Sequence, residues 1–355
     1  MRYFFIILTL SFFFVSHNIY SNIFAPYVKN LYLSIIIYIA LLLLSQSYYL
    51  LANKDLNKLI AYPIFLLIFV YSFMFFYYVI VDIVRIFYLQ NNKQILDLKV
   101  LLVAFICGIF GMYNTYLIRI TRYKITSDKN VKLKIAFMSD LHIGDTGMNN
   151  IRLKKTIDKI NKENVDILIL GGDIIEQDPR YFTSTKLNEY FKKINTKYGM
   201  YAVLGNHEYY GGMPYLISKT LEENGGIKVL NDDYVEFDNI VLIGREDISK
   251  NWFKSRRKDI DDITPIHLNK YNIVIDHNPT YFNEAVNNLI DLQLSGHTHN
   301  GQFFPFNLVV KFYYKKPYGL LKEDKSILIT SSGLGTWRIP IKLFSKPEIV
   351  IVEIN

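Results

Sequence analysis

Eight acidic, amide and imidazole side chains stand out because each follows a short apolar run typical of a β-strand. The chain holds 7 histidines in 355 residues, and five of them belong to this set. The stretch "LQLSGHTHNGQ" places two of them only two positions apart. The full set is Asp140, His142, Asp173, Asn206, His207, His277, His297 and His299. Side chains of these types bind metals, and carboxylates and imidazoles also transfer protons.

Each of these motifs has an ordinary structural explanation when it is taken alone. "SDLH" could be a helix N-cap followed by a chance histidine, and "GGD" could be a tight turn. "GNHE" and "GHTH" could equally be polar turns. A potential metal ligand nevertheless follows one predicted strand after another. Because the carboxyl ends of the strands in an open α/β sheet lie along one edge, the recurrence favours one shared site over five unrelated turns.

The mixture of oxygen and nitrogen ligands predicts a site for two divalent metal ions. Carboxylate and amide oxygens combined with imidazoles suit Mn, Fe, Zn, Co or Ni better than Mg or Ca. Seven such ligands exceed what one ion with space for water requires, but they suffice for two ions that share a carboxylate. Residues i and i+2 of an extended segment point to the same side, which explains the D-x-H and H-x-H spacings. Two ions ~3.5–4 Å apart can bridge a hydroxide and clamp a phosphoryl group during in-line attack.

The elements that would position these residues alternate between strand and helix. The runs "KLKIAFMSD" and "VDILILGGD" predict strands, and "NNIRLKKTIDKINKEN" between them predicts an amphipathic helix. Two further helical patterns follow, "STKLNEYFKKINTK" and "MPYLISKTLEENGG", the second ending on a glycine pair that suits a helix C-terminus. Later strands such as "NIVIDH", "DLQLSGH" and "EIVIVEI" complete the sheet core. We therefore expect an α/β layered domain over residues 125–355, preceded by the linker "TRYKITSDKN".

Residues 1–124 instead predict a transmembrane anchor of about four helices. Long apolar segments cover residues 3–20, 31–51, 59–81 and 100–118, each near the ~20 residues needed to cross a bilayer. Polar stretches such as "NKDLNK" separate them. The first segment could be a signal peptide, but no small-x-small cleavage site follows it, so we expect an uncleaved span. Four successive uncharged runs also disfavour the alternative of a buried helical core.

Charge and cysteine content narrow the class of protein further. The formal net charge of +8 comes from dispersed basic residues without a zinc-finger, RRM or KH signature, so no nucleic-acid partner is expected. The single Cys107 precludes an internal disulfide. Lys and Arg residues flanking the predicted spans favour a cytoplasmic C-terminal domain by the positive-inside rule, and loss of the first span would invert this orientation.

Taken together, the strand-end motifs resemble the calcineurin-like metallophosphoesterase superfamily. Its pattern D-x-H, GD, GNH(D/E), H and GH-x-H is matched in order by Asp140-Leu-His142, Gly172-Asp173, Gly205-Asn206-His207-Glu208, His277 and Gly296-His297-Thr-His299. With the N-terminal spans, "GHTHNGQ" and the tail "SSGLGTWRIPIKLFSKPEIVIVEI", the chain is similar to the transmembrane metallophosphoesterase branch, which is related to UDP-diacylglucosamine hydrolase-like phosphodiesterases. The resemblance implies a four-layer α-β-β-α sandwich that follows the transmembrane helices.

The resemblance also implies a role for each residue of the set. The first metal would take Asp140, His142, Asp173 and His299. The second metal would take Asp173, Asn206, His277 and His297, so that Asp173 bridges the two ions. His207 would lie beside the ions, where it would stabilise phosphate charge or protonate the leaving oxygen as a general acid.

The resulting expectation is a multi-pass protein of the bacterial cell membrane that hydrolyses a phosphodiester by attack of a metal-bridging hydroxide. Its partners would be membrane lipids and a phosphoester substrate, with lipid-linked or nucleotide-sugar lipid compounds as the favoured type. A phosphomonoesterase or nucleotide phosphodiesterase of the same fold stays open, as does a non-catalytic metal-binding receptor or scaffold. The physiological substrate, the native metals and the oligomeric state are not determined by the sequence.

Two further stretches, one basic and one rich in aromatic residues, do not belong to the predicted site. The charge run "KSRRK" at residues 254–258 is typical of a solvated surface. The stretch "GQFFPFNLVVKFYYKKPYG" mixes aromatic residues with Lys311, Lys315 and Lys316. It could enter the membrane interface beside the site, or it could be a core strand with its lysines facing outward.

Overall fold

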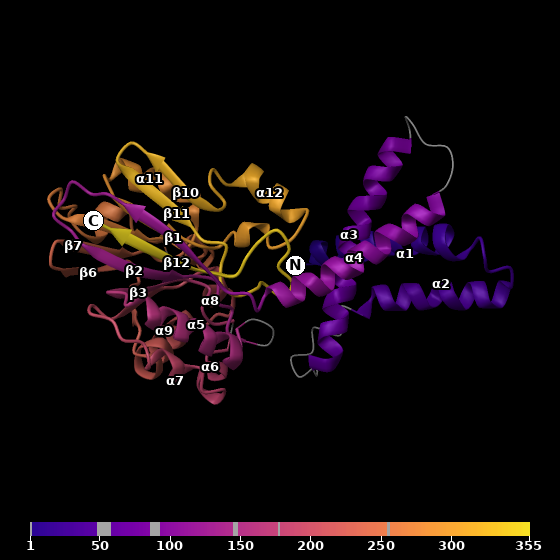
Figure 1. Ribbon diagram of the computed structural model, residues 1–355, viewed down its shortest axis with the longest axis horizontal. Helices are drawn as coiled ribbons and strands as arrows, with labels where there is room; N and C mark the ends of the chain where they lie inside the picture. Colours follow the sequence, from indigo (N-terminus) through magenta and orange to yellow (C-terminus); the bar gives the residue numbers. More distant parts are fainter. Residues whose placement is uncertain (1, 48–57, 86–92, 145–147, 177, 254–255) are drawn as a thin grey trace. The chain divides into compact units, whose positions relative to one another are not determined.

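The computed structural model describes residues 2–47, 58–85, 93–144, 148–176, 178–253 and 256–355 (Figure 1). The chain divides into two compact units, Met1–Tyr113 and Asn114–Asn355. The first unit ends eleven residues before the boundary expected at residue 124. The assignment of an anchoring role to the first unit and a catalytic role to the second stays a prediction.

The first unit is helical, and each of the four apolar segments predicted from the sequence forms a helix. These are α1 (Arg2–Ile19), α2 (Leu31–Ser45), α3 (Lys58–Arg85) and α4 (Lys93–Asn114), with a π-helical turn at Tyr20–Phe24. Two stretches are long and apolar enough to cross a bilayer by length and composition, Ile60–Asp82 in α3 and Asp97–Asn114 in α4. The apolar α2 is shorter, and part of its predicted segment, residues 48–51, lies outside the described residues. The prediction of four spans is thus supported for two helices.

The second unit is built on two mixed six-stranded sheets. The first has the order β1-β12-β2-β3-β4-β5 and the second the order β10-β11-β9-β8-β7-β6. Strands β2 to β5 run parallel, as do β7, β8, β9 and β11. Their bounds are β1 (Arg119–Ile125), β2 (Leu133–Met138), β3 (Ile167–Gly171), β4 (Met200–Val203), β5 (Lys228–Val229), β6 (Asp233–Phe237), β7 (Ile240–Gly244), β8 (Tyr271–Ile275), β9 (Leu292–Ser295), β10 (Gly319–Glu323), β11 (Ser326–Thr330) and β12 (Glu348–Ile354).

Helices connect the strands and pack on the outer sheet faces. In Figure 1 α5, α7 and α9 lie together along the side of β3, and α11 lies beside the second sheet. The helices are α5 (Asn150–Glu163), α6 (Arg180–Ser184), α7 (Asn188–Phe191), α8 (Asn206–Tyr210), α9 (Pro214–Gly225), α10 (Ile260–Ile263), α11 (Phe282–Asn287) and α12 (Phe306–Tyr313), with short 3-10 turns that include η3 (Ile248–Phe253), η4 (Pro279–Tyr281) and η5 (His299–Gly301). The helices predicted at α5 and α9 are confirmed, and Gly226 ends α9 with a left-handed φ of 68°.

The strands bury alternate side chains in different apolar cores, which explains the layered architecture. Along β2, Ile135 and Phe137 belong to the core between the two sheets, together with residues of β7, β8 and β9. Ala136 and Met138 belong to the core that α5 and α9 cover. A third core lies between the second sheet and α11. Each fully buried large apolar side chain stabilises this sandwich by roughly 1.5–3 kcal/mol.

Two local expectations were wrong, and one open alternative is excluded. The first half of the predicted linker, residues 121–125, belongs to β1, which pairs in parallel with β12 over seven residues. Its charged residues alternate with apolar ones that face the sheet core, so an edge strand looks polar in sequence. The predicted helix at residues 184–197 is confined to α7, four residues long. For residues 301–319 the alternative of a core strand is excluded, because the stretch contains helix α12, and the alternative of a segment at the membrane interface stays open.

Candidate metal centre

All eight strand-end residues lie at the carboxyl ends of neighbouring strands in the two sheets. They follow β2, β3 and β4 in the first sheet and β8 and β9 in the second. Seven of them form three overlapping groups whose ligand atoms lie within 4.8 Å of one another: Asp140, His142 and His299; His142, Asp173 and His207; and Asp173, His277 and His297. The remaining residue, Asn206, has its Oδ1 2.8 Å from Nδ1 of His297. The structure therefore brings the whole predicted set together.

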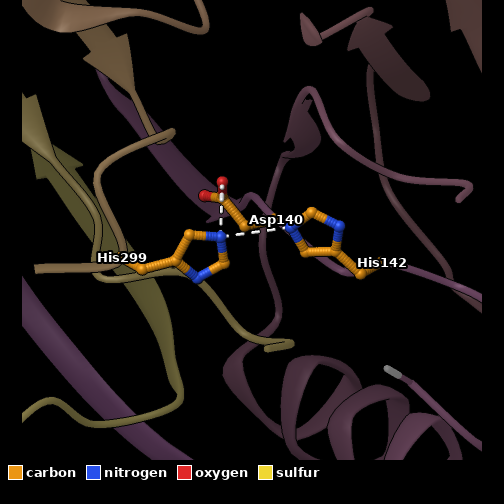
Figure 2. A group of neighbouring side chains, drawn as sticks. All are labelled: Asp140, His142 and His299. Atoms are coloured by element: carbon orange, nitrogen blue, oxygen red, sulfur yellow. Dashed lines mark hydrogen bonds and ion pairs between the residues drawn. The ribbon is translucent and has the colours of Figure 1, made fainter. Parts of the chain in front are cut away.

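The first group joins one residue pair after β2 with a histidine after β9. Figure 2 shows Asp140, His142 and His299 pointing toward one another. The Nε2 atoms of the two histidines are 3.1 Å apart, and Nε2 of His299 is 3.4 Å from Oδ1 of Asp140. Two imidazole nitrogens and a carboxylate oxygen therefore converge on one small volume.

The carboxylate of Asp173 lies between the first group and a second one. Its Oδ2 is 3.9 Å from Nε2 of His142 and 3.3 Å from Nε2 of His277. Its Oδ1 accepts a hydrogen bond from the backbone N–H of His207 at 2.9 Å. The side chain is almost completely buried, and the surrounding histidines hold the pKa of the carboxyl well below its usual range although burial works in the opposite direction. Asp173 is therefore placed to be shared by two ions.

The backbone is strained at three of these turns. Asp140, His142, Asp173, His297 and His299 all have a positive φ, between 46° and 69°. A residue with a Cβ pays roughly 1–2 kcal/mol for this left-handed conformation. Backbone hydrogen bonds hold it, among them Asp140 N–H to the Gly172 carbonyl at 3.0 Å. Such strain persists where the surrounding structure over-determines the conformation, as at ligand sites.

Two motif glycines are required by close approach rather than by turn geometry. A Cβ on Gly205 would lie 2.3 Å from Oδ1 of Asp173. A Cβ on Gly296 would lie 2.4 Å from Oδ2 of Asp140. Both values are far below a van der Waals contact, so any larger residue would displace a carboxylate of the site.

Hydrogen bonds and burial orient the histidines of the site. Nδ1 of His277 donates to the carbonyl oxygen of Gly171 at 2.7 Å, which turns Nε2 toward Oδ2 of Asp173. Burial opposes the charged form of His277, but Asp173 outweighs it and raises the pKa of His277 well above its ordinary value. Burial lowers the pKa of His299 well below its ordinary value, and the nearby His142 lowers it further, so this imidazole is neutral. The buried Nε2 of His277 has no hydrogen-bond partner in the described part of the chain. Imidazole nitrogens, carboxylates and an amide oxygen together form a donor set suited to two divalent ions.

Glu176 is a site residue that sequence reasoning missed. Its two carboxylate oxygens contact Nδ1 of His142 at 2.7 Å and Nδ1 of His207 at 2.8 Å. Burial would raise the pKa of Glu176, but the hydrogen bonds with the two histidines outweigh it and lower the pKa to about 2. Burial likewise opposes the charged form of His207, yet Glu176 and Asp173 raise its pKa to about 9. The only sequence signal was an acidic residue three positions after Asp173.

Glu208 also acts behind the site. Its carboxylate accepts hydrogen bonds from four backbone N–H groups, those of Gly205, Asp173, Ile174 and Ile175, at 2.6 to 3.1 Å. These bonds tie the turn after β4 to the turn after β3. The sequence placed Glu208 in the "GNHE" motif without predicting this role.

A loop from the end of β11 covers the other side of Asp140. The N–H of Gly335 donates to the carbonyl of Asp140 at 2.7 Å. The fully buried Lys342 holds this loop, since its Nζ donates to the carbonyls of Ser332 and Gly333, each at 2.6 Å. Burial lowers the pKa of Lys342 to about 7. No sequence pattern had indicated that a lysine of the C-terminal tail supports the site.

Comparison with known proteins agrees with this geometry. The family model described as "Calcineurin-like phosphoesterase" matches residues 133–301, which contain every residue of the site described above except the loop after β11. An uncharacterized metallophosphoesterase of Aquifex aeolicus is 30% identical over 262 residues, covering 71% of this chain and 98% of that protein. The chain belongs to the calcineurin-like phosphoesterase family. It is accordingly a metal-dependent phosphoesterase, and members of this family use two divalent metal ions.

Other relatives share only part of their length with this phosphoesterase. An uncharacterized metallophosphoesterase of Campylobacter jejuni is 32% identical, over 63% of this chain and 59% of that protein. A "transmembrane protein with metallophosphoesterase domain" of Danio rerio is 26% identical, over 63% of this chain and 53% of that protein. The chain thus spans about three fifths or less of these two relatives.

Solved structures resemble the phosphoesterase distantly. The NAD nucleotidase of Haemophilus influenzae has a TM-score of 0.38 and 17% identity, with 57% of this chain and 51% of that chain covered. A dimetal phosphatase of Danio rerio has a TM-score of 0.36 and 12% identity, with 59% and 88% covered. Likeness at this level carries no information on substrate.

Proposed function

We propose that the protein is a membrane-anchored phosphodiesterase that holds two divalent metal ions at the strand-end site. The first ion would be bound by Asp140, His142, Asp173 and His299, and the second by Asp173, Asn206, His277 and His297. The observation that carries this proposal is the position of Asp173, whose Oδ2 lies 3.9 Å from a nitrogen of one histidine group and 3.3 Å from a nitrogen of the other. A single carboxylate can then serve both ions.

The chain's own residues would then divide the work of phosphoester hydrolysis. Two divalent ions, when bound, neutralise phosphoryl charge and supply a nucleophile from water at neutral pH. His207 is held by Glu176 through Nδ1, and its raised pKa keeps it protonated near neutrality. Its Nε2–H is therefore available to stabilise negative charge on the phosphoryl group or to protonate the leaving oxygen.

The preference for an amphiphilic phosphodiester, such as a lipid-linked or nucleotide-sugar lipid substrate, rests on the helical N-terminal unit. Its two stretches with the length and composition of membrane spans would keep the enzyme at a bilayer, where such substrates are concentrated. The "transmembrane" designation of the Danio rerio relative supports the same arrangement. A cytoplasmic catalytic unit follows from the distribution of Lys and Arg around the spans.

The test is hydrolysis of bis-p-nitrophenyl phosphate by the purified full chain loaded with Mn. We expect Asp173→Asn to lose activity by at least ~10²-fold together with bound metal, whereas His207→Ala should lose activity by ~10²–10⁴-fold and keep its metal. Asp158→Asn is the matched control, because Asp158 is an exposed carboxylate on α5 that pairs only with Lys154 among the ion pairs of the described residues.

The result that contradicts the proposal is equal inertness of the wild-type and Asp173→Asn proteins, with zero or one metal per chain. That result would favour a metal-binding receptor or scaffold. Faster hydrolysis of p-nitrophenyl phosphate than of the diester would instead indicate a phosphomonoesterase at the same site.

A further inference from the structure

Helix α12 (Phe306–Tyr313) turns its apolar side chains away from the protein. No residue of this helix, all of which the structure describes, is buried, and Phe312 and Tyr313 expose 90% and 79% of their surface. The polar Asn307 packs inward, since its side-chain Oδ1 is buried. A surface helix of a soluble protein ordinarily shows the reverse arrangement, with its polar face toward water.

A second segment extends this apolar surface. Trp337 and Phe344 expose 46% and 69% of their surface. The buried Gln302, just before α12, ties the two segments together: its Nε2 donates to the Trp337 carbonyl at 3.1 Å, and its Oε1 accepts from the Trp337 N–H at 2.7 Å. The rings of Phe304 and Phe344 are 6.5 Å apart. We call the combined surface the rim; it consists of Leu308, Val309, Phe312, Tyr313, Trp337 and Phe344.

The rim borders the metal centre. The ring of Tyr314, which follows α12, lies 6.0 Å from the ring of His297. The ring of Trp337 lies 6.5 Å from the ring of His207. The turn η5, which contains His299, leads directly into α12 and contacts it. Whatever the rim binds is therefore brought to the opening of the site.

The charges around the rim identify its occupant. Lys311 and Arg338 are exposed beside the aromatic and aliphatic side chains, and so is Lys315, whose Nζ pairs with the carboxylate of Glu323 at 2.6 Å. Aromatic and aliphatic residues accompanied by lysines are the composition of helices that lie in the interface of an anionic bilayer. The same chain supplies a route to a bilayer, because the candidate span in α4 ends at Asn114 and β1 begins at Arg119.

We propose that the rim inserts into the interface of an anionic bilayer, so that the metal centre opens toward the lipid headgroups. The enzyme would then take substrates whose phosphoester lies at headgroup depth and whose acyl chains stay in the membrane. The identity of the reaction rests on the proposed function, whereas insertion of the rim is independent of it.

Lipids brominated on their acyl chains test the insertion, because bromine quenches tryptophan only at close range. The full chain is reconstituted in vesicles of phosphatidylcholine and phosphatidylglycerol after the native tryptophans are removed by Trp252→Phe and Trp337→Phe. Phe312→Trp then reports on the rim. Leu268→Trp is the matched control, because Leu268 is 66% exposed but precedes β8, at the end of the strand opposite the metal centre.

We expect brominated lipids to quench the tryptophan at position 312 at least about twofold more than the one at position 268. Equal quenching at both positions, or emission at 312 that the lipids leave unchanged, would overturn the proposal; the second result would mean that water or a protein surface covers α12. Hydrolysis of bis-p-nitrophenyl phosphate by the chain with both native tryptophans, in vesicles of the same composition, separates the two proposals. Quenching without hydrolysis would support insertion of the rim and contradict the proposed enzyme activity. Hydrolysis without quenching would support the enzyme activity and contradict insertion of the rim.

Discussion

At the scale of single residues, Glu176 shows how the protein couples a metal ligand to a proton donor. One carboxylate holds Nδ1 of His142 and Nδ1 of His207, so it orients both rings and fixes which nitrogen of each carries the proton. Its negative charge also stabilises the imidazolium form of His207. The position of the ligand and the charge of the candidate acid therefore depend on the same side chain.

Glu176→Gln should weaken both the positioning of His142 and the protonated form of His207. Because the pKa of His207 is raised to about 9, the charged form is fully present at neutral pH and is lost as the pH rises through 9. Without the carboxylate, the pH at which His207 loses its proton should fall toward 6.5, the ordinary pKa of histidine. We expect kcat for bis-p-nitrophenyl phosphate to fall ~10–100-fold, with the alkaline limb of its pH profile displaced to lower pH.

The control for this substitution is Glu189→Gln, which removes an exposed carboxylate that pairs with Lys192 at 3.0 Å on the surface. It should leave the pH profile unchanged. If Glu176→Gln lowered kcat without moving the alkaline limb, Glu176 would position His142 alone and would not control the charge of His207.

At the scale of elements, the site is a set of tight turns that follow parallel strands. The turns after β2, β3 and β9 have a positive φ at a ligand position. The turns pack so closely that backbone and carboxylate oxygens are in contact, as Gly296 shows against Asp140. The strands fix the separation of the turns, and the turns then fix the ligands.

Gly296→Ala should therefore disrupt the site. The added Cβ would meet Oδ2 of Asp140 at 2.4 Å, so the carboxylate or the turn after β9 must move. We expect loss of about one metal ion per chain, measured by elemental analysis of the purified protein, because interiors tolerate overlap poorly.

Gly212→Ala is the comparison, since a Cβ there meets nothing within 4 Å although the φ of 71° is unfavourable for alanine. It should cost about 1 kcal/mol of stability from the backbone and keep both metals. Equal metal content in the two variants would show that the close approach at Gly296 is not needed for binding.

At the scale of the whole molecule, the site lies where the two sheets of the second unit meet. Asp140, Asp173 and Asn206 come from the first sheet, whereas His277 and His297 come from the second. Each of the two proposed ligand sets therefore includes residues of both sheets, since His299 and His297 also follow β9. Bound ions would link the two halves of the sandwich in addition to the core between them.

Removal of metal should for this reason destabilise the fold. At a free metal concentration of 100 times Kd, binding to the native state alone contributes about 2.7 kcal/mol per site. We expect a chelator to lower the Tm of the second unit by several degrees, as followed by circular dichroism in detergent. Asp173→Asn should show a much smaller shift, and an equal shift in both proteins would mean that the chelator acts at another site.

The sequence alone determined the α/β class of the second unit, the apolar helices of the first and the residues that gather at the strand ends. These features depend on local patterns: hydrophobic periodicity sets the elements, and residues directly after parallel strands must lie at one edge of a sheet. That the gathered residues bind metal in the proposed pairs stays a prediction. The edge strand β1 escaped this reasoning because its alternating charges look like a linker.

Only the tertiary structure decided which distant side chains support the site. The contact of Glu176 with His207 joins residues 31 positions apart, and Lys342 reaches a loop that covers Asp140. Such contacts depend on how turns and sheets pack, for which a single sequence carries no local signal. The same is true of α12: the sequence left this stretch open between a core strand and a segment at the membrane interface, and only the structure shows a helix whose apolar side chains are uncovered.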